Sequence, residues 1–161
     1  MGAFISIGFP RPRSPEHDDA IPHALAALGL SCAEPGIFAE EQLVDDWLWS
    51  FDGRPVRLTR RSYPEDGGWG STVLDLHEED YLQLVNGLGA SHVVDALVGL
   101  AERLLLALEL PWVGLGHEFE VEDPDEGVGA EVLLVRGGVG GVSRPWGALR
   151  LSDVPERLFR G

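Results

Sequence analysis

The sequence predicts an α+β fold, a mainly antiparallel sheet with helices packed on one face. Three observations predict it. Several segments alternate apolar and polar residues with a period of two, which is typical of half-buried strands. Turn signals such as Asp52-Gly53 separate these segments, as in antiparallel hairpins. One long apolar segment, residues 91–110, has the period of a helix covered on most sides. A chain of 161 residues is expected to form one globular domain, 1–161.

The first part of the chain is expected to contain a strand and two helices. Residues 3–9 alternate in character and predict a largely buried strand. A helix is expected from about Pro22 to Leu28, because proline suits a first helical turn and Gly29 suits a helix end. Residues 36–46 have apolar residues on one side and carboxylates on the other, which fits a short helix.

The next segment is predicted to be a β-hairpin. Asp52-Gly53 is a strong two-residue turn signal between two alternating runs. A two-residue turn pairs residue 49 with residue 56 and residue 47 with residue 58, so that an aromatic face meets an aliphatic one.

The middle of the chain predicts a strand followed by two helices. The strand covers residues 71–76, and a helix over 77–86 would be capped by Asp75 and Glu78 as a pair. The apolar helix at 91–110 is expected to be the central core helix, with Ser91 as its N-cap.

The last third is expected to add strands to the sheet. Residues 111–122 are predicted to be extended, with Phe119 and Val121 facing one way and the glutamates the other. Residues 130–136 and 146–152 are predicted to form two more strands, before a closing helical turn.

The chain is strongly acidic. Twenty-seven Asp and Glu residues face twelve basic residues, all of them Arg, which gives a net charge of −15. Such a field repels nucleic acid and anionic membranes and favours a basic protein partner. The single Cys32 excludes an internal disulfide and a CxxC motif. The N-terminal apolar run stops at Pro10, too early for a signal peptide, so we expect a cytoplasmic protein.

Most catalytic signatures are absent from the sequence. Without Lys there is no Walker A lysine and no Schiff-base lysine, and HExxH does not occur. We therefore assign no catalytic residue, metal ligand or cofactor. One enzymatic alternative stays open. His77 and His117, each beside carboxylates, flank the core helix, and together they would suit a small hydrolase or a metal-dependent enzyme.

Two features indicate a contact surface for another protein. A run of alternating carboxylates follows the core helix, and Trp69 lies in a loop of Gly, Glu and Asp. A solvated strand edge is the simpler explanation of the carboxylates. A docking face would use the same residues to speed association with a basic partner. The expected contact residues are Trp69, Glu118, Glu120, Glu122, Asp123, Asp125 and Glu126.

These features together favour a non-enzymatic acidic protein that binds and neutralises a basic protein. A bacterial toxin-immunity protein is the instance of this class that fits best, by analogy of class and size alone. An acidic regulatory domain, similar to an antirepressor, is a further alternative that differs only in its partner. The sequence leaves open whether the protein is a monomer or a homodimer.

Overall fold

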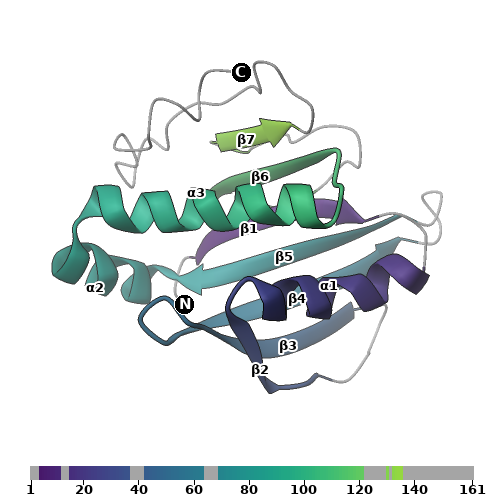
Figure 1. The fold of residues 1–161 in the computed structure, drawn as a ribbon, viewed down its shortest axis with the longest axis horizontal. Helices are drawn as coiled ribbons and strands as arrows, with labels where there is room; N and C mark the ends of the chain where they lie inside the picture. Colours follow the sequence, from purple (N-terminus) through teal and green to yellow (C-terminus); the bar gives the residue numbers. More distant parts are fainter. Residues whose placement is uncertain are drawn as a thin grey trace.

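The computed structural model describes residues 4–11, 15–36, 42–63, 69–121, 130 and 132–135. These residues form one seven-stranded antiparallel sheet with the strand order β2-β3-β4-β5-β1-β6-β7. Three helices lie across one face of the sheet (Figure 1). The predicted α+β class, with a mainly antiparallel sheet and helices on one face, is confirmed.

The strands and helices are labelled in chain order. The strands are β1 (Phe4–Arg11), β2 (Leu30–Glu34), β3 (Gln42–Trp49), β4 (Arg54–Tyr63), β5 (Trp69–His77), β6 (Trp112–His117) and β7 (Val132–Val135). The helices are α1 (Pro15–Ala27), α2 (Glu78–Leu88) and α3 (Ala90–Ala107). The first strand of the chain lies inside the sheet, because β1 pairs with β5 on one side and with β6 on the other.

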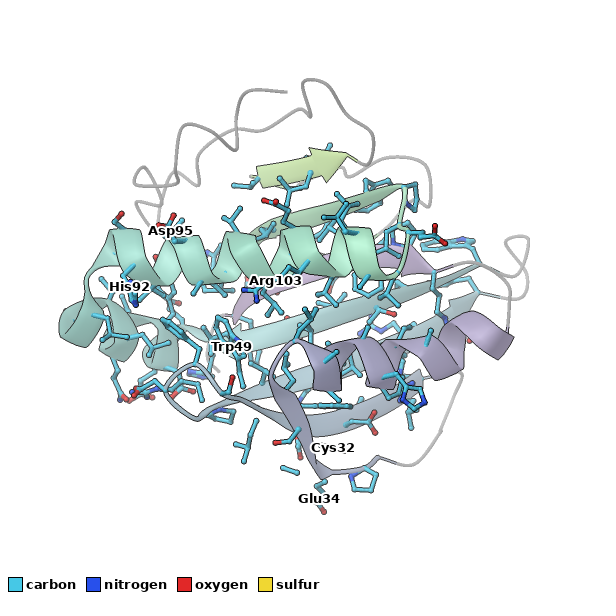
Figure 2. The ribbon with its side chains drawn as sticks, viewed as in Figure 1. Cys32, Glu34, Trp49, His92, Asp95 and Arg103 are labelled. Carbon is cyan, nitrogen blue, oxygen red and sulfur yellow. The ribbon has the colours of Figure 1, made fainter. Side chains whose placement is uncertain are left out.

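The helix α3 is the predicted core helix. Its buried residues recur at helical spacing and are Val93, Val94, Leu97, Val98, Leu100, Ala101, Leu104 and Leu105. They pack on apolar residues of the sheet, and Figure 2 shows Trp49 between the α1 and α3 ribbons. Leu106, expected to widen the buried stripe, is instead 63% exposed. None of the described helices is both long and apolar enough to cross a membrane.

The expected N-cap of α3 is wrong. The helix begins at Ala90 and its N-cap is Gly89, which provides no side-chain hydrogen bond. Gly89 has a φ of 90°, a backbone conformation that glycine adopts without strain. This residue also ends α2, so one glycine turns the chain directly from one helix into the next. Ser91 consequently falls inside α3.

The hairpin forms with a register two residues away from the predicted one. Trp49 pairs with Arg54 and Trp47 pairs with Val56, across a four-residue loop. Phe51 leaves the strand, and its ring lies 4.9 Å from that of Trp49 and 5.7 Å from that of His92. A shift of two residues keeps every side chain on its predicted face, since the strand period is two.

The segment predicted as a short helix contributes a strand instead. Residues 42–49 form β3, while residues 37–41 lie outside the described part of the chain. The carboxylate of Asp45 is buried on the helix-covered face. It accepts hydrogen bonds of 2.6 Å from Arg60 and from the Gly36 amide, which offset the cost of its burial. Tertiary pairing therefore supports a strand where local charge alternation favoured a helix.

The ends of the chain differ from expectation or lie outside the described residues. The helix α1 begins at Pro15, so Pro22 lies in its interior instead of its first turn. The strand β2 at the sheet edge was not predicted, and Figure 2 shows its exposed Cys32 there. The strand expected at 130–136 is present as β7. The strand and helical turn expected after residue 145 are not among the described residues.

The packing of α3 predicts unequal effects for two of its leucines. Leu104 is completely buried, so Leu104→Ala should lower the free energy of unfolding by about 2–5 kcal/mol. Leu106→Ala is the matched control and should change stability by less than about 0.5 kcal/mol. Chemical denaturation of both variants measures this difference. Equal losses would contradict the orientation of α3.

Candidate functional site

The face of the sheet opposite the helices, called here the second face, is polar along its middle strands. The pleat puts alternate residues on opposite faces, so the buried Leu58, Leu74 and Ile7 face the helices. Their sequence neighbours therefore face the other way. Cross-strand pairing aligns Arg57 with Asp75, and Asp75 with Ser6, in one row on the second face.

Part of the second face is covered by the chain that follows β6. Glu118 has a φ of 55°, and its amide donates to the Phe4 carbonyl over 2.8 Å. From this turn the chain leaves the sheet, and Phe119 and Val121 become buried while Glu118 and Glu120 stay exposed. The predicted alternation of this segment is thus present, although the strand itself ends at His117.

Two glycines make room for this crossing segment. A Cβ atom on Gly114 would lie 2.7 Å from the Phe119 ring, and one on Gly8 would lie 2.9 Å from Val121. Such distances are too short for real side chains. Phe119 and Val121 form a second apolar cluster with Trp112 and Ala130, separate from the main core. Because Gly8 and Gly114 have no Cβ atom, Phe119 and Val121 can pack directly on the sheet, and the crossing segment lies against it.

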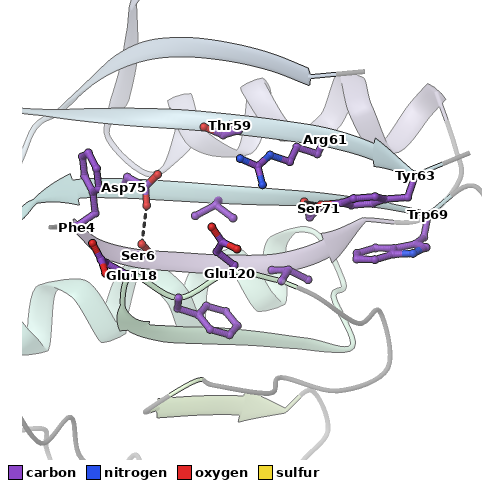
Figure 3. Close-up of a pocket in the computed structure, with 13 residues that line it drawn as sticks. Phe4, Ser6, Thr59, Arg61, Tyr63, Trp69, Ser71, Asp75, Glu118 and Glu120 are labelled. Atoms are coloured by element: carbon purple, nitrogen blue, oxygen red, sulfur yellow. Dashed lines mark hydrogen bonds between the residues drawn. The ribbon is translucent and has the colours of Figure 1, made fainter. Parts of the chain in front are cut away.

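A cavity of about 650 Å³ lies on the second face, between β4, β5, β1 and the crossing segment (Figure 3). Its lining has an aromatic part and a charged part. Tyr63 and Trp69 form the aromatic part, and their rings are stacked with centroids 4.4 Å apart. These two residues are cross-strand partners at one end of β4 and β5, so the sheet itself sets their contact.

Asp75 occupies the charged part of the cavity. Its carboxylate accepts a hydrogen bond of 2.6 Å from the Ser6 hydroxyl. Burial raises the pKa of Asp75 above its ordinary value, and the negative charge of Glu120 raises it further. The Ser6 hydrogen bond and the positive charges of Arg57 and Arg61 oppose this rise without cancelling it. The carboxylate of Asp75 is therefore costly to keep ionised in the folded protein.

Arg61 supplies the cationic side chain of the cavity. Its Nε donates to the side-chain oxygen of Gln42 on β3 over 3.0 Å. In Figure 3 the guanidinium group points along the sheet, towards the part of the cavity that holds Asp75 and Glu120. Among the described residues, no ion pair within 4.0 Å joins Arg61 to Asp75, Glu118 or Glu120.

The structure brings together three of the residues expected to contact a partner. Trp69, Glu118 and Glu120, which are distant in sequence, all line the cavity (Figure 3). Trp69 is half-buried against Tyr63 and the second apolar cluster, while both glutamates are exposed. The other four expected residues, Glu122, Asp123, Asp125 and Glu126, lie outside the described part of the chain.

Sequence reasoning missed other residues of the cavity. Asp75 was interpreted as a helix cap, but α2 is capped by His77, whose Nδ1 accepts from the Glu79 amide over 3.1 Å. Tyr63 and Arg61 were not singled out. The signal for them was the alternation on β4, where Arg57, Thr59, Arg61 and Tyr63 recur at every second residue.

The two histidines of the enzymatic alternative do not form a joint site. His77 pairs with Phe4, and His117 pairs with Ile5, so the pleat directs them to opposite faces at one end of the sheet. His77 contacts the Phe4 ring, and His117 lies 3.5 Å from the Glu78 carboxylate. Among the described residues, no group of three or more His, Cys, Asp or Glu side chains is arranged to hold a metal ion.

Comparisons of the chain with family models, with curated proteins and with solved structures find no match.

The glycine at residue 114 gives a test of the crossing segment. Gly114→Ala forces the Phe119 ring away, so we expect a loss of about 1–3 kcal/mol in unfolding free energy. Gly87→Ala is the matched control, because Gly87 is an exposed residue of α2 with open space around it. This variant should gain less than about 1 kcal/mol in unfolding free energy. Thermal unfolding compares the two. A neutral Gly114→Ala variant would contradict the packing of Phe119 on β6.

The raised pKa of Asp75 predicts a pH-dependent stability. The folded state favours the protonated form of Asp75. The contribution of this residue to stability is therefore fully present below its unfolded pKa and is lost as the pH rises through its folded pKa. Asp75→Asn should therefore be more stable than the parent at neutral pH. This gain should shrink as the pH falls through the raised folded pKa and should be absent below about pH 4, where the carboxyl group is protonated in both states. Denaturation curves across this range measure the gain.

Glu102→Gln, on the exposed side of α3, controls for the general loss of one negative charge. A neutral-pH stability of Asp75→Asn below that of the parent would show that the ionised carboxylate supports the fold, contrary to this account.

Proposed function

We propose that this protein is an acidic binding protein that docks a basic protein on its second face and neutralises that protein. One observation carries the proposal. A concave site on this face combines a stacked Tyr63–Trp69 pair with the carboxylates of Asp75, Glu118 and Glu120. Aromatic side chains are enriched at the centres of protein interfaces, and complementary charge speeds association.

The charge of the whole chain supports the same proposal. A net charge of −15 attracts a basic partner over distances of about a Debye length and repels nucleic acid. The glutamates Glu118 and Glu120 are exposed on this face, where an approaching surface meets them first. In this view long-range attraction brings the partner near, and the cavity determines how it docks.

The biological setting that fits such a protein best is toxin immunity in the bacterial cytoplasm. An immunity protein acts by covering the active surface of a toxin, and a basic toxin surface would match this acidic face. A DNA-binding regulator would present a similarly basic surface. The identity of the bound protein distinguishes these two partners.

Charge reversal at the cavity tests the proposal. The tagged 161-residue chain should retain a basic protein from a lysate of its own host at low salt and lose it at high salt. The double variant Glu118→Arg/Glu120→Arg should lower the association rate by about tenfold or more. Capture at two salt concentrations, followed by binding kinetics with the identified protein, gives both measurements.

The control variant has the same change of charge on the helix-covered side of the sheet. Glu79→Arg/Glu102→Arg replaces two exposed glutamates of α2 and α3, so it shifts the net charge equally and leaves the cavity intact. Capture lost equally in both variants would mean that general charge, rather than the second face, attracts the partner. A captured protein whose activity is unchanged by binding would contradict neutralisation.

A further inference from the structure

The cavity on the second face is long and narrow. Its lining follows β5 from Trp69 to Asp75, with Ser71 and Val73 between them. Neighbouring residues of a strand are about 3.3 Å apart, so the two ends of this lining are separated by about 20 Å. Figure 3 shows the same arrangement, with Trp69 and Asp75 at opposite ends. One side chain cannot reach from end to end, so a ligand that fills the cavity is itself elongated.

The cross-section of the cavity admits one extended polypeptide chain. A volume of about 650 Å³ over a length of about 20 Å gives a mean cross-section of about 30 Å². An extended chain occupies a width of about 4.7 Å beside a neighbouring strand and fits this space. An α-helix, which is about 10–12 Å in diameter with its side chains, does not fit. The length of the cavity corresponds to about six extended residues.

Two oppositely charged side chains border the middle of the cavity. Arg61 comes from β4 on one side of β5, and Glu120 comes from the crossing segment on the other side (Figure 3). Within the described part of the chain, no ion pair within 4.0 Å joins them. Arg61 uses its Nε for Gln42, so its terminal nitrogens can donate to a ligand. An extended backbone has carbonyl and amide groups on both sides, so it can accept from Arg61 and donate to Glu120.

The two ends of the cavity differ in character. At one end the stacked rings of Tyr63 and Trp69 form an aromatic surface, and Trp69 packs on the second apolar cluster. At the other end lie the carboxylates of Asp75 and Glu118 (Figure 3). A segment bound along the cavity therefore places an apolar side chain against the rings and polar groups near the carboxylates.

We infer that the cavity is a groove for one extended segment of the partner protein, about six residues long. The backbone of the segment bonds to Arg61 and Glu120, and an apolar side chain at one end packs on Tyr63 and Trp69. This inference rests on the proposed function and names the part of the partner that is bound. The basic partner presents an extended loop or a chain end to the second face, instead of a helix.

Peptides of different length and constant charge test the groove. The 161-residue chain is titrated by calorimetry with blocked peptides of three, six and nine residues. Each peptide contains one terminal leucine, two arginines and otherwise alanine, and each is made with the leucine at either end to sample both chain directions. We expect the six-residue peptide to bind about tenfold more tightly than the three-residue peptide, because it makes more backbone hydrogen bonds. The nine-residue peptide should bind within about twofold of the six-residue peptide, because its added residues lie beyond the groove.

Two variants locate the ends of the bound segment. Tyr63→Ala removes one ring of the aromatic pair and should weaken binding of the three-residue and six-residue peptides by about fivefold. Glu118→Gln, at the far end, should weaken the six-residue peptide by about threefold and leave the three-residue peptide unchanged. Glu102→Gln is the matched control, because it removes an exposed carboxylate from α3 and should not change binding. Tyr63 and Glu118 lie outside the main core, so both variants should fold.

Equal affinity of the three-residue and six-residue peptides would overturn the inference, because no extended groove would then be filled. An affinity that rises as steeply from six to nine residues as from three to six would overturn it as well. So would equal weakening by Glu118→Gln and Glu102→Gln, since charge anywhere on the surface would then suffice.

Two further outcomes separate this inference from the proposed function. A protein that captures a basic partner yet binds no peptide of the series would refute the groove alone, because the partner would then dock through a folded surface. A protein that binds the peptides with the expected length dependence and captures no basic protein would refute the proposed function while keeping the groove.

Discussion

The burial of α3 against the sheet is the interaction on which the rest of this structure depends. The apolar side of the helix covers residues from the middle strands, among them Ile5, Ile7 and Leu74, which are almost completely buried. Because side chains alternate across a sheet, this packing determines the face of every other residue on those strands. Ser6, Asp75 and their neighbours face away from the helices for that reason, and the polar cavity is a consequence of the core.

The absence of side chains at two positions is the second constraint. Gly8 and Gly114 lie in register on neighbouring strands, where Phe119 and Val121 pack directly onto the backbone. The left-handed conformation of Glu118 turns the chain into this position. Those features carry Glu118 and Glu120 over the sheet, towards Asp75. If β6 had continued as a strand past His117, these glutamates would not lie over β1 and β5.

The cavity also contains a group that lowers the stability of the folded protein. The half-buried carboxylate of Asp75 is destabilised by desolvation and by Glu120, and Ser6, Arg57 and Arg61 compensate only in part. Elsewhere the chain satisfies its buried charge more fully, since Asp45 accepts bonds from both Arg60 and the Gly36 amide. Unfavourable groups that persist in a concave site are candidates for function, because binding can recover what folding loses.

The sequence by itself determined the fold class, the core helix and the alternation of the main strands. These depend on the period of apolar residues, a local pattern that burial enforces. It also indicated Trp69, Glu118 and Glu120 as exposed or unusual groups. It misjudged the hairpin register, the strand at 42–49 and the caps of α2 and α3, because each depends on contacts with distant residues, such as those of Phe51 and Asp45.

Only the tertiary structure decided which residues share a site. Tyr63 and Arg61 on β4, Asp75 on β5 and Glu120 after β6 are separated along the chain by other elements. Their meeting requires the strand order β4-β5-β1-β6, in which the first strand of the chain enters between later ones. Residue periodicity carries no information on strand order, because every order of the same strands buries the same alternating faces.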